Sequence, residues 1–202
     1  IVEDATEALG SYYKNKHLGN YGDLGVFSFN GNKIISTGGG GAIVTNNKKL
    51  ASKVNHLAST AKVVHPYRYI HDEIGYNYKL PAINASLGCS QISKLKSLIQ
   101  KKKKLYYSYK NFFKNIDGIR IVSNPKKCVS NFWLQTLILD KNNYNIKDEI
   151  IKDCHRNGIY VRPVWDILPK LKMYKKSPRM DLSTSKEAYA SIINLPSSSD
   201  LF

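Results

Sequence analysis

The segment Gly25–Gly41 reads GVFSFNGNKIISTGGGG and carries the most informative pattern in the chain. Its apolar residues Val26–Phe29 predict a short strand, after which Lys33 lies in a loop of Gly and Asn residues. A lysine held by such a loop can present its amine to a carbonyl group and form a Schiff base. Ser28 can offer its hydroxyl to a phosphate, and the glycine run lets the backbone approach a ligand closely. The alternative interpretation is a flexible surface loop with an ordinary lysine.

Upstream of this segment, residues 2–10 read VEDATEALG and predict the end of a buried strand that runs into acidic residues. Folds of the α/β class bind ligands just past the carboxyl ends of their strands. At that place Asp4 can hold a proton on a pyridine nitrogen, as a pyridine-based cofactor requires. The alternative is that Asp4 caps a helix that follows it.

Downstream, residues 71–80 read HDEIGYNYKL and form a polar, aromatic segment before a predicted helix. Pro81 suits the first turn of that helix, and helix N-termini favour phosphates. The alternative is a packed loop with an Asn-containing turn. His71 is a candidate metal ligand or base, although a structural histidine is the more common case.

The remaining hydrophobic patterns predict further helices and strands. Helices are expected at residues 48–58, 82–116 and 146–157, the second as one long amphipathic helix or two helices joined by a kink. Strands are expected at residues 42–45, 119–122, 131–139 and 159–162, with residues 59–80 irregular. The order of elements after residue 117 indicates a βαβ-like unit that begins a smaller second domain.

Composition narrows the class of protein. The 202 residues are 42% hydrophobic and 23% charged, as in globular proteins, and no apolar run is long enough to cross a membrane. The three cysteines are widely spaced, so neither a structural zinc site nor a disulfide framework is expected. The net charge of +16 comes from 26 scattered Lys and only 5 Arg. A solvated surface, including most of Lys101–Lys104, is therefore favoured over a nucleic-acid or nuclear-localisation role.

Together the motifs VEDATEALG, GVFSFNGNKIISTGGGG and GYNYK, in this order, resemble the DegT/DnrJ/EryC1/StrS family of sugar aminotransferases, which use pyridoxal 5′-phosphate (PLP). The sequences of the Lys33 loop and of residues 65–81 are most similar to the branch of the family that acts in legionaminic acid and related surface-sugar pathways. The resemblance implies an α/β fold of the fold-type I PLP-dependent transferases and a chain that is a C-terminal fragment. It assigns residues 1–85 to the large PLP-binding domain, 86–117 to a long connecting helix and 118–202 to a truncated small α+β domain.

The resemblance also implies roles around the cofactor. Lys33 would form the Schiff base and later move a proton. Asp4 would pair with the pyridine nitrogen, and Glu7 stands where relatives often have Gln near the ring hydroxyl. Ser28 would bind the cofactor phosphate.

Four further residues acquire roles by the same resemblance. Asn77 would reach across a dimer interface to the phosphate of the partner's cofactor. Lys79 replaces the usual Arg at a phosphate or substrate contact. Arg162 and Trp165, in the segment YVRPVW, lie where relatives contact the sugar nucleotide.

The activity implied is transfer of an amino group from glutamate to a nucleotide-linked 4-keto-6-deoxy sugar, for surface polysaccharide or nonulosonic acid synthesis. The full-length protein is expected to be a cytoplasmic homodimer with a shared active site, without a metal, nucleic acid or membrane, and the isolated fragment is expected to be inactive. Two alternatives stay open. One is a PLP-binding relative that does not transaminate, and the other is a basic nucleic-acid or anion-binding module.

Overall fold

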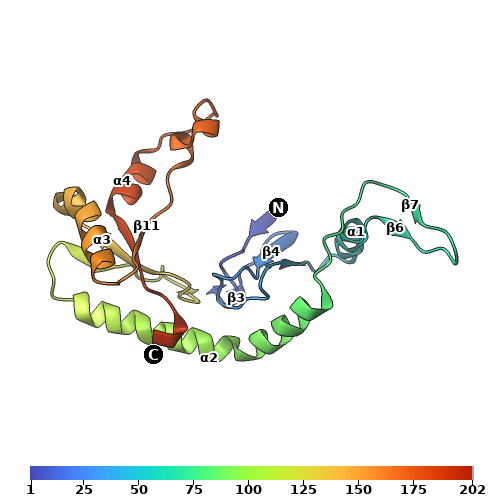
Figure 1. Ribbon diagram of the computed structural model, residues 1–202, viewed down its shortest axis with the longest axis horizontal. Coiled ribbons are helices and arrows are strands. Elements are labelled where there is room, and N and C mark those ends of the chain that lie inside the picture. The colour runs from blue at the N-terminus through green and yellow to red at the C-terminus, as the bar shows by residue number, and fades with distance from the viewer. Residues whose placement is uncertain (202) are drawn as a thin grey trace. The chain divides into compact units, whose positions relative to one another are not determined.

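The computed structural model describes residues 1–201, which group into two compact units. The first unit holds residues 1–99 and 125–133, and the second holds residues 100–124 and those from 134 onward. The long helix α2 (Ala82–Phe113) is a single helix of 32 residues that contributes to both units (Figure 1). It ends three residues earlier than the hydrophobic pattern predicts. Within residues 1–201, no helix has both the length and the apolar content that a membrane crossing requires.

The first unit is built on a three-stranded sheet in the order β1-β4-β5. Strand β1 (Val2–Asp4) runs parallel to β4 (Leu24–Ser28), and β5 (Gly41–Val44) runs antiparallel to β4 (Figure 1). Asp4 lies opposite Val26 in this register, so the carboxyl ends of β1 and β4 meet at the same edge. The predicted strands 26–29 and 42–45 are confirmed to within two residues.

A second small sheet joins segments that are far apart in the sequence. Strands β2 (Tyr12–Tyr13), β3 (Lys16–His17) and β9 (Cys128–Val129) pair antiparallel in the order β3-β2-β9. The turn between β2 and β3 has two residues with positive φ, as tight hairpins of right-handed twist require. These strands are two residues long, too short to leave a pattern in the sequence. Through β9, residues 125–133 become part of the first unit.

Helix α1 (Lys48–Ala58) has the boundaries that the sequence predicts. Asn47 starts it because the side-chain oxygen of Asn47 accepts hydrogen bonds from the backbone N–H groups of Lys49 and Leu50, at 2.9 and 3.2 Å. The region expected to be irregular contains two short antiparallel strands, β6 (Lys62–Val63) and β7 (Ile70–His71).

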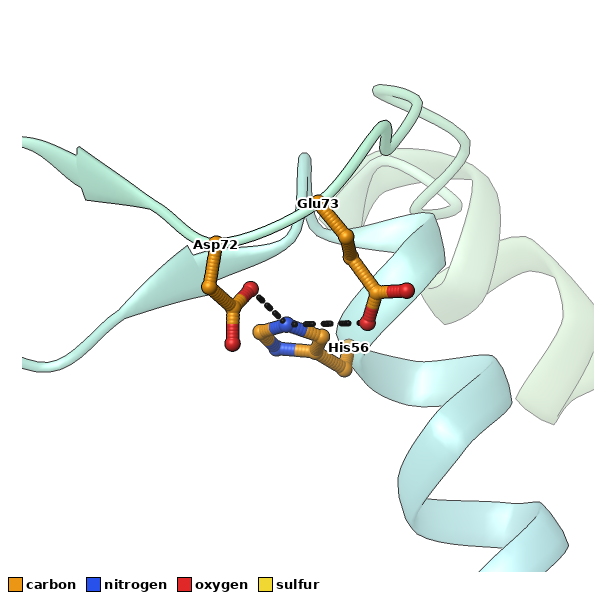
Figure 2. Close-up of side chains that lie close together, drawn as sticks. All are labelled: His56, Asp72 and Glu73. Atoms are coloured by element: carbon orange, nitrogen blue, oxygen red, sulfur yellow. Dashed lines mark hydrogen bonds and ion pairs between the residues drawn. The ribbon is translucent and has the colours of Figure 1, made fainter.

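An ion-pair cluster fastens the base of this hairpin to α1. Figure 2 shows His56 pointing from α1 toward Asp72 and Glu73, which follow β7. The His56 Nε2 atom lies 2.6 Å from Asp72 Oδ1 and 3.5 Å from Glu73 Oε1. The Lys53 ammonium donates to both carboxylate oxygens of Glu73. The hydrogen bond from His56 lowers the pKa of Asp72, so this carboxylate stays ionised below its ordinary range.

Replacing this histidine, in the variant His56→Ala, is expected to loosen the hairpin without unfolding the protein. Hydrogen exchange of the backbone amides in residues 61–76 should become a few fold faster, because exposed ion pairs hold only local structure. The folded pKa of Asp72 is depressed, so its contribution is complete above pH 3.8 and is lost as the pH falls through the folded value. The control is His65→Ala, which should speed exchange only at Tyr67 and Arg68, the two amides that donate to His65. Equal exchange in wild type and His56→Ala would contradict this role.

The second unit has a four-stranded sheet in the order β11-β12-β10-β8, with every neighbouring pair antiparallel. Its strands are β8 (Ile119–Ile121), β10 (Gln135–Leu139), β11 (Arg162–Pro163) and β12 (Ile192–Leu195). Its helices are α3 (Lys147–Arg156) and α4 (Ser183–Ser191), with 3-10 turns at Lys141–Ile146, Leu168–Lys170, Lys172–Tyr174 and Ser199–Leu201. Strands β10 and β11 point the same way because both are antiparallel to β12. The predicted βαβ-like unit corresponds to β10, α3 and β11, and β12 lies between its two parallel strands.

Two sequence predictions for the second half need correction, and one region was not predicted. The strand expected at 131–139 begins only at Gln135, because Phe132 adopts a left-handed conformation with φ of 54°. The strand expected at 159–162 is reduced to Arg162–Pro163. The elements α4 and β12 were not predicted.

Most of the lysine run Lys101–Lys104 is exposed, as the sequence predicts, and Lys102 is the exception. Lys102 is buried on the same face of α2 as Leu105 and Tyr106. Its ammonium donates to the backbone carbonyl of Ser197, and burial lowers its pKa to about 8. The stem of this lysine therefore belongs to the core of the second unit.

Candidate functional site

Lys33 lies in a loop that closes on itself just after β4. The backbone N–H of Lys33 donates to Asn30 at 3.0 Å, while Phe29 bonds to Thr37 and Gly40 at 3.0 and 2.9 Å. Only 12% of the Lys33 side chain is exposed. The loop is tied down and the lysine is largely buried, so this is not an ordinary surface lysine.

Two side chains contact the Lys33 ammonium. One is the carboxylate of Glu7, whose Oε1 lies 3.2 Å from Lys33 Nζ. The other is the indole of Trp133, whose ring centroid lies 4.5 Å from the same nitrogen. Both a carboxylate and an aromatic face favour a charged amine.

Asp4 lies at the carboxyl end of β1, exposed at the edge of the sheet that carries Lys33. Its Oδ1 accepts hydrogen bonds from the Thr6 hydroxyl at 2.8 Å and from the Thr6 backbone N–H at 3.3 Å. These bonds lower the pKa of Asp4, and the positive charge of Lys33 adds to the effect. The alternative that Asp4 caps a following helix is wrong, because the chain continues into turns and α1 begins only at Lys48.

The variant Thr6→Val is expected to raise the pKa of Asp4 toward its ordinary value, 3.8, because both shape and backbone stay similar while the hydroxyl donor is lost. A depressed carboxyl pKa stabilises the fold above the unfolded value, and this contribution is lost as the pH falls through the folded value. In Thr6→Val the stabilising contribution of the Asp4 carboxylate should therefore be lost at a higher pH than in the wild type. An NMR titration of the Asp4 carboxyl carbon measures this, with Thr45→Val as the control, since Thr45 bonds to the Asp23 carbonyl instead. An unchanged titration would exclude Thr6 as the cause.

Ser28 and the glycine run stand at the same edge of the sheet. Ser28 is the last residue of β4, and its hydroxyl oxygen accepts from the backbone N–H of Asn30 at 3.3 Å. Gly40 has a φ of 98°, and a Cβ at Gly41 would come within 2.3 Å of the Phe27 carbonyl. These two glycines are thus required by the connection from β4 to β5, and only Gly39 within the run is surrounded by open space.

The other two expected site residues of the first unit lie near α1. Asn77 is exposed and forms an isolated β-bridge with Ser59. The Lys79 ammonium donates to the side-chain oxygen of Asn55 on α1. Lys79 also lines a cavity of about 550 Å³, together with Phe27, Ile43 and Val54.

Arg162 and Trp165 lie in the second unit. The Nη1 of Arg162 lies 3.2 Å from His155 Nε2 and donates to the Val161 carbonyl at 3.3 Å. Trp165 is 66% exposed and lines a largely apolar cavity of about 520 Å³, with Tyr174 and Tyr189 on its wall.

Sequence analysis missed two residues of the Lys33 site. Trp133 contacts Lys33 through its ring, and its Nε1 donates to the Asn32 carbonyl at 2.7 Å. Asn131 is buried, and its amide donates to the carbonyls of Glu7 and Leu9 at 2.7 and 3.0 Å. The apolar character of residues 131–139 predicted a strand, which hid both roles.

A group with metal-ligating atoms lies away from Lys33, although sequence analysis predicts no metal. Ligand atoms of His56, Asp72 and Glu73 lie within 4.8 Å of one another (Figure 2). The Lys53 ammonium already occupies both oxygens of Glu73, and a cation would have to displace it. We therefore describe this group as an ion-pair network.

Comparison with known proteins now identifies the family. The sequence pattern of the DegT/DnrJ/EryC1/StrS aminotransferase family matches residues 1–202. The chain belongs to this aminotransferase family. EpsN of Bacillus subtilis (strain 168), assigned as a pyridoxal phosphate-dependent aminotransferase, is 41% identical over 167 residues, which is 82% of this chain and 42% of EpsN. The GDP-perosamine synthase of Escherichia coli O157:H7 is 35% identical, over 87% of this chain and 47% of the synthase.

A solved structure extends the comparison to the fold. Helicobacter pylori PseC, an aminotransferase involved in the biosynthesis of pseudoaminic acid, superimposes with a TM-score of 0.93 at 27% identity, covering 100% of this chain and 55% of PseC. The chain thus has the fold of PLP-dependent sugar aminotransferases and spans about half the length of the relatives it matches.

Members of the DegT/DnrJ/EryC1/StrS family use PLP, and solved relatives include PLP and PMP forms. The groups gathered at the β1–β4 edge fit this cofactor chemically. Lys33 would supply a primary amine for its aldehyde, Asp4 a carboxylate for its ring nitrogen, and Ser28 a hydroxyl for its phosphate.

Proposed function

We propose that the full-length protein is a PLP-dependent aminotransferase that moves an amino group from glutamate to a nucleotide-linked 4-keto-6-deoxy sugar. The product would serve surface polysaccharide or nonulosonic acid synthesis. The observation that carries the proposal is Lys33, largely buried against the Glu7 carboxylate and the Trp133 ring at the sheet edge that bears Asp4. Family membership and the names of the relatives support the substrate class.

In this proposal, Lys33, Asp4 and Glu7 have different roles in the reaction. PLP, when bound, supplies an electron sink that stabilises negative charge on the carbon of the amino donor. Lys33 holds the cofactor and then moves a proton with its Nζ atom. Asp4 keeps a proton on the ring nitrogen, and its lowered pKa keeps its carboxylate ionised for that task. Glu7 accepts from Lys33 Nζ and so orients the amine.

Other assignments complete the proposal. Ser28 binds the cofactor phosphate, and Asn77 reaches the phosphate of the cofactor in the second subunit of a cytoplasmic homodimer. Lys79, Arg162 and Trp165 contact the nucleotide sugar. We also propose that residues 1–85 belong to the large domain, 86–117 to the connecting helix and 118–202 to the small domain, of which residues 125–133 pack within the first compact unit.

The test uses the full-length protein with PLP. The visible absorbance of bound PLP should disappear when glutamate is added, with one 2-oxoglutarate formed per site. A nucleotide-linked 4-keto-6-deoxy sugar should then restore the absorbance and yield the amino sugar, whereas the same sugar with a 4-hydroxyl group should not. Folded protein that binds no PLP would overturn the proposal. Protein that binds PLP but releases no 2-oxoglutarate from glutamate would instead support a relative that does not transaminate.

A further inference from the structure

Trp133 holds the Lys33 loop at two points. Its indole N–H donates to the carbonyl of Asn32, directly before Lys33, at 2.7 Å. Its ring lies 4.5 Å from Lys33 Nζ. One side chain therefore fixes both the backbone and the ammonium of the same lysine.

Asn131 also bonds at two points, to the turns that follow β1. Its side-chain N–H groups donate to the carbonyls of Glu7 and Leu9, at 2.7 and 3.0 Å. Its side-chain oxygen accepts from the backbone N–H of Trp133 at 3.0 Å. Asn131 thus connects Glu7 to Trp133, and these are the two residues that contact the Lys33 ammonium.

The residue between them has a costly conformation. Phe132 is buried, with a φ of 54°, in the left-handed region that bulky residues rarely adopt. Such a conformation persists only where the surrounding contacts enforce it, and it is common at ligand clamps. Here the left-handed residue lets Asn131 and Trp133 bond to two different segments, residues 7–9 and 32–33. Strand β9 anchors this turn to β2 from the preceding side.

We propose that the turn Asn131–Trp133 is a positioning element for Lys33, and that the face of Trp133 holds the Lys33 ammonium beside Glu7 when the amine is not bonded to the cofactor. The inference rests on the proposed function, in which Lys33 must carry a proton on Nζ. An aromatic face attracts a cation through its ring quadrupole. A lysine has four rotatable bonds, so a second group besides Glu7 is needed to restrict its ammonium to one place.

The test measures Lys33 itself in the full-length protein without PLP. Lysines are labelled with an amine-specific reagent at one fixed pH, and the rate of labelling of the Lys33 peptide is measured by mass spectrometry. In Trp133→Leu, Lys33 should be labelled about threefold faster, because its ammonium loses the aromatic face that holds it. In Trp133→Phe, which keeps an aromatic face, the increase should be smaller. A purely structural role would leave the labelling rate unchanged in variants that keep the shape of the ring.

A second series guards against misfolding of these variants. Trp133 is replaced at this site alone by tryptophan with one, two and four ring fluorines, which keep the shape but weaken the negative face. The rate of Lys33 labelling should rise stepwise with fluorine number. The control is Tyr69→Leu, which removes the ring under Lys62 at a similar distance, 4.6 Å, and should leave the rate of Lys33 labelling unchanged.

Failure of this inference differs from failure of the proposed function. An unchanged rate of Lys33 labelling in the fluorinated series overturns the positioning role, whether or not the protein binds PLP. A stepwise rise of this rate in a protein that binds no PLP supports the contact between Trp133 and Lys33 and overturns only the proposed function. In protein that binds PLP, the release of 2-oxoglutarate from glutamate should slow about threefold in Trp133→Leu.

Discussion

Replacing Lys33 with alanine is expected to abolish the visible absorbance of PLP bound to the full-length protein and to slow amino transfer from glutamate by about 10³-fold or more. The reason is that no other amine is presented at the β1–β4 edge by the described contacts, where Lys33 Nζ lies between Glu7 and Trp133. Single-turnover release of 2-oxoglutarate measures the effect.

Two further variants make the Lys33 result specific. Lys33→Arg keeps a positive charge beside Glu7 and Trp133, so the fold should survive, but a guanidinium does not form the Schiff base and the activity should be lost. Lys49→Ala removes an exposed lysine of α1 and should leave absorbance and rate unchanged. Full turnover in Lys33→Arg would rule out covalent attachment at this residue.

The variant Asn131→Ala is expected to lower the free energy of unfolding of the full-length protein by about 2–3 kcal/mol. Asn131 is 3% exposed and bonds to the carbonyls of Glu7 and Leu9 and to the backbone N–H of Trp133. Alanine leaves these part-buried backbone groups without this partner. Denaturant unfolding at equilibrium measures the change.

Two comparisons separate lost hydrogen bonds from lost volume. Asn131→Asp keeps the volume and the acceptor but turns an acceptor oxygen toward the carbonyls of Glu7 and Leu9, so it should destabilise at least as much as alanine. Asn30→Ala truncates an exposed asparagine whose oxygen bonds only to its neighbour Gly31 in the contacts described, and it should change stability by less than about 0.5 kcal/mol. A loss of that small size in Asn131→Ala would show that the turn is held by other contacts.

Local signals in the sequence determined the elements whose causes lie within a few residues. Asn47 starts α1 through its own side chain, so both ends of that helix were predicted correctly. The apolar run in β4 and the glycine-rich connection to β5 predicted both strands, and the structure adds a backbone reason for three of the four glycines, a positive φ at Gly38 and Gly40 and a close approach to Phe27 at Gly41. The order of three motifs around Asp4, Lys33 and Asn77 predicted the family, which the family match over residues 1–202 confirms.

Contacts between distant segments determined the rest, and no local pattern records them. The sequence predicts that most of the run Lys101–Lys104 is solvated but does not single out Lys102, whose stem packs in the second unit because the chain near Ser197 lies against α2. Residues 131–133 read as a strand, yet their side chains bond to Glu7 and to the Lys33 loop, segments about a hundred residues earlier. Propensity and periodicity report only what a residue prefers among its near neighbours. Lys33 and the strand that precedes it could therefore be singled out from the sequence, whereas the Glu7 carboxylate and the Trp133 ring that contact this lysine were decided by the tertiary structure alone.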